Sequence, residues 1–353
     1  MSIQQEKLTG IANAIRKAKG TTELIKASDF ESIIQNDLHS KEKDMLQYYV
    51  NNNGNNGAEY LFYCYQGTNI DFAENLNLTD VTSLNAAFMG CVNLTHIPLY
   101  YTPNNTKLAQ TFNGCNKLEQ IPLIDTSKVT TLYSTFENCK SLKTIPLIDT
   151  SNVITMENTF IFCESLESIP LINTSNVINF SQTFRDCKSL KTIPLIDTSN
   201  GTTFTSMFSN CESLESIPLI NTSKATSIGS FFNNCKSLIT IPLLDTSNVT
   251  SFYNLFNGCT ELETVPAINM IKVNNTSGMF KNCTKLKSLL MTGIKCGIDI
   301  SSSTLFERSD LLIILNNLET ITSTSKLTMG STNLAKLTEE DKTIALSKGW
   351  QLA

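Results

Sequence analysis

The chain has 353 residues, 41% of them hydrophobic, so it is long enough to bury a sizeable core. Its formal net charge of −5 argues against a nucleic-acid-binding protein, because such proteins usually carry a basic face. The sequence has neither the run of about 18 apolar residues that marks a transmembrane helix nor the polybasic cluster of a membrane anchor.

The first 20 residues have neither the early basic region nor the apolar core of a secretory signal. We therefore expect synthesis in the cytoplasm, without export by that route. Disulfides are rare in that compartment, so the eleven cysteines of the chain need another explanation.

Residues 1–50 are predicted to form a helical anchoring and oligomerisation segment. Apolar residues at helical spacing predict a helix over residues 4–19, and Ser28 with Glu31 forms a capping box for a second. A third helical piece is predicted from Lys41 to Val50. A segment this small is only marginally stable by itself. We therefore expect it to dock onto a second copy or a partner.

The alternative for this segment is a plain N-terminal cap on the repeats that follow. Residues 51–57 contain five asparagines, two glycines and no apolar residue, which predicts a flexible linker. A flexible linker favours the interpretation of residues 1–50 as an anchor, because linkers separate an anchoring segment from a functional domain.

Residues 58–290 are built from a repeat of 24 residues. The repeat is marked by nine cysteines at that spacing: Cys91, Cys115, Cys139, Cys163, Cys187, Cys211, Cys235, Cys259 and Cys283. Leucine, phenylalanine and isoleucine recur in columns of their own, and a fixed period of this length is typical of a solenoid. We predict an α+β fold, a leucine-rich-repeat-like solenoid with short parallel strands.

Each repeat is expected to contain the same local elements. The Leu-x-x-Ile-Pro-Leu stretch predicts a short strand, and Asp-Thr-Ser predicts a turn. Val-x-x-Met or Val-x-x-Phe predicts a second extended piece, and Thr-Phe-x-x-Cys predicts a single helical turn. Equivalent positions are expected to stack on neighbouring repeats.

Charges alternate from one repeat to the next. Lys140 and Lys143 are followed by Glu164 and Glu167 in the same places. Lysine stacked over glutamate gives attractive pairs where identical charges would repel, so the alternation needs no ligand to explain it.

One row of small polar residues is the candidate binding site. It precedes each Ile-Pro and comprises His96, Gln120, Thr144, Ser168, Thr192, Ser216, Thr240 and Thr264. In a leucine-rich repeat this row faces outward, where hydroxyls can meet a glycan or a protein. They can equally be ordinary strand-forming residues, since threonine favours strands.

The cysteines are not arranged for chemistry. No Cys-x-x-Cys pair is present, the only histidines are His39 and His96, and stacked parallel side chains do not point at one another for disulfides. We expect a buried structural ladder of free thiols, with no metal, no cofactor and no catalytic residue.

Residues 291–353 break the 24-residue period and predict a capping region of mixed helix and strand. A helix is expected over 309–318 with Ser309 at its N-cap, then a strand and turn over 326–330. A last helix begins at Thr338 and ends at Lys348-Gly349, after which Trp350 folds back on it. A solenoid needs such an atypical end to cover its last repeat.

Three stretches resemble known families. Phe-x-x-Cys-x-x-Leu followed by Asp-Thr-Ser-Asn-Val-Thr, best seen in DTSNVTSFYNLFNGC (residues 245–259), resembles the BspA-like leucine-rich repeats of bacterial surface proteins over residues 80–290. LTGIANAIRKAKGTTELIKASDF resembles the start of phage tail or minor structural proteins, and LTMGSTNLAKLTEEDKTIALSKGW resembles a tail shared by repeat proteins of phages of low-GC bacteria.

These resemblances imply a non-enzymatic, tail-associated structural or adhesion protein of a virion. Residues 1–50 would attach to other tail proteins and form a homo-oligomer, and the solenoid would meet a host-surface glycan or protein. A bacterial BspA-like adhesin and an intracellular interaction scaffold are the alternatives. We expect neither nucleic-acid binding nor membrane insertion. A glycan depolymerase is not favoured, because the sequence has no carboxylate constellation outside the repeats.

Overall fold

The computed structural model describes residues 42–52, 57–322 and 325–353. The chain divides into two compact units, Met1–Leu166 and Glu167–Ala353. The division lies inside the predicted repeat region 58–290, and the predicted boundaries at 51–57 and 290 stay predictions. The helix over 4–19 and the capping box of Ser28 lie outside the described residues.

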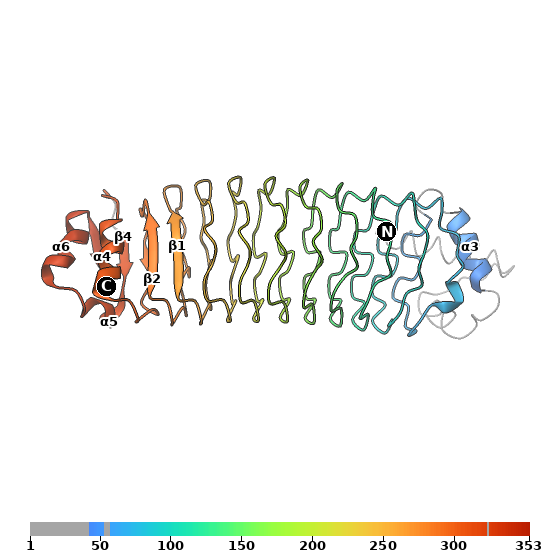
Figure 1. Cartoon of the computed structure of the whole chain (residues 1–353), viewed down its shortest axis with the longest axis horizontal. Coiled ribbons are helices and arrows are strands. Elements are labelled where there is room, and N and C mark those ends of the chain that lie inside the picture. The colour runs from blue at the N-terminus through green and yellow to red at the C-terminus, as the bar shows by residue number, and fades with distance from the viewer. Residues whose placement is uncertain (1–41, 53–56, 323–324) are drawn as a thin grey trace, which may run out of the picture. The chain divides into compact units, whose positions relative to one another are not determined.

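Within each unit the backbone returns beside itself every 24 residues. We call one such turn of the chain a coil; successive coils can be followed in Figure 1. Parallel bridges join Ser83 to Lys107 and Thr131 to Thr155 in the first unit. The second unit has the same bridges at other positions, such as Ser251 to Asn275. They fall in the second extended piece of each repeat, so equivalent residues of adjacent coils lie side by side.

The predicted helical turn at Thr-Phe-x-x-Cys is wrong, because consecutive tight turns occupy that stretch. Gln110 has φ 58° and Gly114 has φ 80°, and neither value is compatible with a right-handed helix. The amide of Thr111 bonds back three residues to Leu108, whereas the amide of Phe112 bonds across to Thr135 of the next coil. Alternate amides thus stabilise the turn and the stack.

The predicted strand in every repeat is present only near the C-terminal end of the described coils. β1 (Thr264–Asn269) pairs in parallel with β2 (Ser288–Thr292), with Thr264 opposite Ser288, and Figure 1 shows the two side by side. On the other described coils the Ile-Pro-Leu stretch forms no ladder, although an isolated parallel bridge joins Thr240 to Thr264. Proline lacks an amide hydrogen, and coils with a proline here, such as Pro194 and Pro218, lose a donor that Leu290 of β2 retains.

The interior of each unit is a set of identical side chains stacked coil upon coil. The rings of Phe112 and Phe136 are 5.6 Å apart and nearly parallel, as are those of Phe208 and Phe232 at 6.0 Å. The leucine, isoleucine and cysteine columns are buried beside them. Burial of large apolar side chains at about 25 cal/mol per Å² is the main stabilising term for such a stack.

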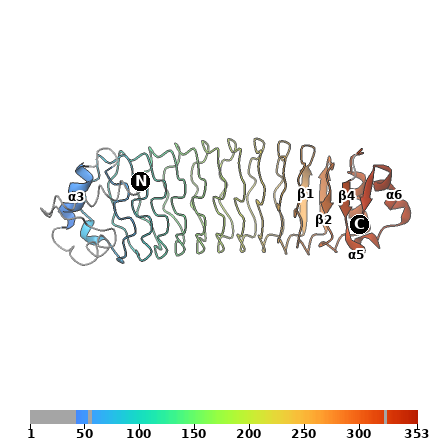
Figure 2. The same ribbon diagram turned by 180° about the vertical axis from the view of Figure 1, so that it is seen from behind.

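Helix α3 (Glu42–Asn52) covers the first coil of its unit, as Figure 2 shows. Tyr49 and Val50 are buried, and the Tyr49 hydroxyl donates a 2.9 Å hydrogen bond to the carbonyl of Glu59. The Gln47 side chain accepts from the amide of Asn77 at 2.7 Å and donates to its carbonyl at 3.0 Å.

These contacts show how the described part of this segment packs. The predicted third helix is confirmed, but its C-terminal half packs on the coils instead of standing apart from them. It also continues through Asn51 and Asn52, two residues assigned to the linker. This packing is compatible with an N-terminal cap, and the assignment of residues 1–50 as an anchoring segment stays a prediction.

The C-terminal residues fold into a small α/β cap. Its elements are β3 (Ile298–Asp299), α4 (Arg308–Asn316), β4 (Ser325–Thr328), α5 (Gly330–Leu334), α6 (Glu339–Ser347) and β5 (Trp350–Leu352). The three strands form a parallel sheet in the order β3-β4-β5. The two longer predicted helices and the strand are confirmed, and Trp350 is buried where β5 begins. The N-cap of α4 is Glu307, which forms a capping box with Asp310, so the assignment to Ser309 is wrong.

Candidate interaction surface

The predicted binding row lies on the outside of the coils. Seven of its residues, from His96 to Thr240, are exposed, and Thr264 is half-buried at the start of β1. The hydroxyl of Thr264 lies 3.0 Å from that of Thr240 on the neighbouring coil. Within each unit the structure thus brings these residues together as a narrow polar stripe.

Sequence reasoning missed a second outward row, which is apolar. It comprises the leucines that follow each Ile-Pro, and we call it the leucine row: Leu99, Leu123 and Leu147 in the first unit, and Leu171, Leu195, Leu219 and Leu243 in the second. Their exposed fractions run from 58% to 67%, which is unusual for so many equivalent leucines. The sequence did contain a signal for the exposure of this row. Leu147 lies two residues before Asp149, and residues two apart on an extended chain lie on the same side.

A third outward row holds the acid or amide that begins each Asp-Thr-Ser or Asn-Thr-Ser turn, and we call it the Asx row. Asp149 is exposed and accepts a 2.9 Å hydrogen bond from the amide of Ser151. Asp125 accepts from the hydroxyl and the amide of Ser127 at 2.7 and 3.0 Å. These bonds favour the charged form, so the pKa of each carboxyl lies below its usual range and both are anionic at neutral pH.

A groove runs beside the leucine row in each unit. In the first unit it has a volume of about 440 Å³ and is lined by Leu99, Leu123, Leu147 and the Asx-row residues Asp125 and Asp149, among others. In the second unit a groove of about 690 Å³ is lined by equivalent residues that include Leu219, Leu243 and Asp245. Both grooves are therefore a repeated surface and not a single pocket.

The alternating charges pair across coils. Lys140 lies 3.3 Å from Glu164 in the first unit, and Lys236 lies 3.0 Å from Glu212 in the second. All four side chains are about a third or more exposed, and such exposed pairs contribute at most about 1 kcal/mol each. This pairing accounts for the alternation without a ligand.

The nine repeated cysteines are buried and form no disulfides. The thiol of Cys139 donates to the carbonyl of Phe112 on the preceding coil at 3.1 Å, and other thiols of the ladder make the same bond. Burial raises the pKa of Cys139 and Cys211 far above the ordinary value, so neither is a nucleophile at neutral pH.

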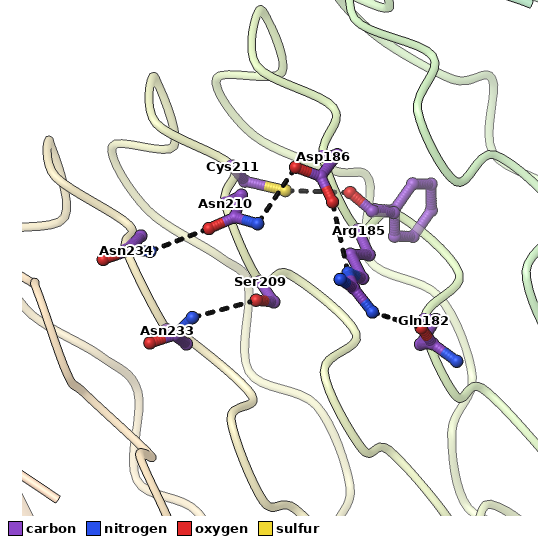
Figure 3. A network of polar contacts seen from close by, with 9 residues as sticks. Gln182, Arg185, Asp186, Ser209, Asn210, Cys211, Asn233 and Asn234 are labelled. Atoms are coloured by element: carbon purple, nitrogen blue, oxygen red, sulfur yellow. Dashed lines mark hydrogen bonds and ion pairs between the residues drawn. The ribbon is translucent and has the colours of Figure 1, made fainter. Parts of the chain in front are cut away.

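A polar ladder crosses three coils of the second unit, as Figure 3 shows. The side-chain amide of Asn234 donates to Asn210, and that of Asn210 donates to the carboxylate of Asp186, both at 2.9 Å. Arg185 donates to the other carboxylate oxygen of Asp186 at 3.1 Å and to Gln182 at 2.7 Å. These bonds give hydrogen-bond partners to the carboxylate of Asp186, whose side chain is almost fully buried. We therefore assign the polar ladder a structural role.

No group of three or more histidine, cysteine, aspartate or glutamate side chains within residues 42–52, 57–322 and 325–353 is placed to hold a metal ion. No helix in the same ranges combines the length and the apolar character that crossing a membrane requires.

One family model matches most of the repeat region. It is described as "Mycoplasma protein of unknown function, DUF285" and matches residues 56–168, 106–218, 142–241 and 213–293. None of the curated proteins compared with the chain matches it.

Several solved structures of leucine-rich-repeat proteins resemble the chain. The T. pallidum leucine-rich repeat protein is 22% identical, with a TM-score of 0.38, over 47% of this chain and 76% of that one. A leucine-rich repeat protein from Eubacterium ventriosum is 19% identical, with a TM-score of 0.38, over 72% and 76%. An internalin from Listeria monocytogenes is 16% identical, with a TM-score of 0.29, over 82% and 77%.

Proposed function

The chain belongs to the DUF285 family of Mycoplasma proteins of unknown function, and we propose that it is a non-enzymatic protein that binds other proteins through the outward face of its coils. We propose, too, that its 24-residue repeats form a leucine-rich-repeat-like solenoid, whose role is to present that face.

The exposed leucine row carries this proposal. Four leucines of the second unit, Leu171 to Leu243, occupy equivalent places on successive coils, and each is at least 58% exposed. Monomeric soluble proteins rarely leave large contiguous apolar patches in water, and such patches commonly mark protein interaction sites. Because the coils beneath are held by buried ladders, the row is preorganised, which lowers the entropic cost of binding.

Site-specific photo-crosslinking tests the proposal. A photoreactive residue in place of Gln120 or Ser216, beside the leucine row, should give a defined cross-linked protein in cells that express the full chain. The matched control places it at Ile154, which is also exposed but lines neither groove. Equal cross-linking from all three positions, or none from any, contradicts a binding face.

The finer proposal is that the chain is a tail-associated virion protein. Its support is the resemblance of residues 8–30 and 327–350 to phage proteins. Residues 1–41 would then attach to tail components and form a homo-oligomer, while 42–52 cap the coils. Sedimentation of the full chain and of a variant without residues 1–41 tests this, since only the full chain should be oligomeric. A monomeric full chain that binds no tail component would refute it.

A BspA-like surface adhesin is the second candidate. The observation that favours it is the exposed hydroxyl row, from Thr144 to Thr240, on coils that resemble adhesin repeats. This candidate predicts binding to a glycan array that Thr192→Val and Ser216→Ala weaken. Binding unaffected by these variants would exclude the row as its site.

A further inference from the structure

We propose that the groove between the leucine row and the Asx row binds an extended protein segment in which apolar side chains alternate with lysine or arginine. The inference deepens the proposed binding function and rests on it. It names the chemistry of the partner, which the exposed leucines alone do not define.

The geometry of one coil sets the two walls of the groove. Leu147 and Asp149 are exposed, whereas Ile148 between them is buried. Residues two apart on an extended chain lie on the same side, about 6.6 Å apart. Leucines of successive coils therefore form an apolar wall, and the acids form a parallel anionic wall beside it.

The charge of the lining selects the partner. Among the described residues that line the first groove, Asp125 and Asp149 are the only carboxylates, and there is no lysine or arginine. The nearest cation along the chain, Lys128, donates its ammonium to Asn104 at 2.9 Å. Among the described residues neither carboxylate lies within ion-pair distance of a cation, although Lys128 interacts electrostatically with Asp125. No cation contributes to the lowered pKa of Asp149, so a cationic partner side chain would find an unneutralised charge there.

The second groove repeats this composition independently. Leu219 and Leu243 form its apolar wall, and Asp245 is the one charged side chain among the described residues that line it. Asp245 accepts a 2.9 Å hydrogen bond from the amide of Ser247, and the pKa of its carboxyl is lowered by the serine. Asn221 replaces the acid on the preceding coil, so this groove is the less anionic of the two.

An extended segment fits both walls at once. Its side chains point alternately to opposite sides, so apolar residues can face the leucines while the residues between them face the carboxylates. Apolar contact supplies affinity and the charge pairs supply selectivity, because like charges at the same place are repelled.

Fluorescence anisotropy with the full chain and three synthetic octapeptides tests the inference. The probes are an alternating Leu-Lys peptide, a Leu-Glu peptide and a Ser-Lys peptide, which separate apolar contact from charge. We expect the Leu-Lys peptide to bind at least about tenfold more tightly than either of the others. Binding should weaken as salt is raised, since the carboxylates are exposed.

Variants of the first groove locate the binding. Leu123→Ser with Leu147→Ser, and Asp125→Asn with Asp149→Asn, should each weaken Leu-Lys binding by about tenfold, and the second pair should also reduce its salt dependence. Ile154→Ser and Glu119→Gln, exposed residues outside the groove, are the matched controls and should leave binding unchanged.

The results that would contradict this inference can be distinguished from one another. Equal binding of the Ser-Lys peptide, or unchanged binding by the groove variants, overturns the inference. If sedimentation shows that the leucine variants abolish self-association, the occupant is a second copy and the inference is also overturned. If cross-linking near the leucine row succeeds while the peptides fail, the proposed function stands and only the partner chemistry is wrong.

Discussion

The thiol of Cys235 donates a 3.1 Å hydrogen bond to the backbone carbonyl of Phe208, 27 residues earlier and one coil away. The same bond joins Cys259 to Phe232 and Cys283 to Phe256, both at 3.0 Å. Each cysteine thus ties two coils together through the interior, and the carbonyl that it meets accepts a second bond from within its own coil.

Thiol labelling should distinguish the ladder from the remaining cysteines. Cys64 and Cys296 are half-buried, whereas the nine ladder cysteines are buried. Burial raises the pKa of Cys235 and Cys259, so their thiols stay protonated as the pH rises through the ordinary cysteine range. With a disulfide reagent at pH 8 we expect at most two fast thiols in the native protein and eleven in denaturant. Fast labelling of most of the eleven would contradict the ladder.

Phe208→Ala should strongly destabilise the second unit. Its ring is fully buried and stacks between Phe184 at 5.6 Å and Phe232 at 6.0 Å. Removing such a ring leaves a cavity and lowers the free energy of unfolding by about 3–5 kcal/mol. Leu195→Ala on the exposed row is the control and should change it by less than about 0.5 kcal/mol. Denaturant unfolding followed by circular dichroism measures both, and similar losses would contradict the burial pattern.

Gly258→Ala should be destabilising for two separable reasons. Gly258 has φ 78°, which costs a residue with a Cβ about 1 kcal/mol or more, and an added Cβ would lie 2.1 Å from the side-chain oxygen of Asn234. Combining it with Asn234→Ala removes the clash and leaves the backbone cost. A double-mutant cycle should therefore show a coupling of about 0.5–3 kcal/mol. Additive effects would mean that the contact is not tight.

The C-terminal cap should loosen in acid through Asp341. Arg308 donates two hydrogen bonds to its carboxylate, at 2.8 and 2.7 Å, and the amide of Thr338 donates a third at 2.8 Å. These partners, the arginine first, lower the pKa of Asp341 from 3.8 to about 2. Because the folded-state pKa is depressed, the stabilisation is complete above about pH 4 and is lost as the pH falls towards 2.

The fluorescence of Trp350, the only tryptophan, reports on this cap. Its indole donates a 2.9 Å hydrogen bond to the carbonyl of Glu319, so opening of the cap should shift its emission. Asp341→Asn should lower the thermal midpoint of this signal at pH 7 and leave it nearly unchanged at pH 2. Lys326→Gln, at an exposed position of β4, is the control. An equal effect of Asp341→Asn at both pH values would exclude the carboxylate as the cause.

The repeats show why some local predictions failed. Thr-Phe-x-x-Cys has helical spacing, so it predicted a helical turn. Asn210 and Asn234, like Gly258 in the same column, adopt φ near +60° or above, and both residue types tolerate that region. The column of asparagine and glycine was therefore a usable signal, which the spacing of apolar residues concealed.

The sequence by itself determined the 24-residue period, the buried columns and the mixed cap, because each follows from a periodic pattern of apolar residues and from local capping signals. Only the tertiary structure decided that Leu147 is exposed and that α3 packs on the coils. The exposure of Leu147 depends on which side of the coil meets the interior, and the docking of α3 depends on a contact between Gln47 and Asn77, 30 residues apart. Such contacts are set by how coils pack, and local sequence carries no direct record of them.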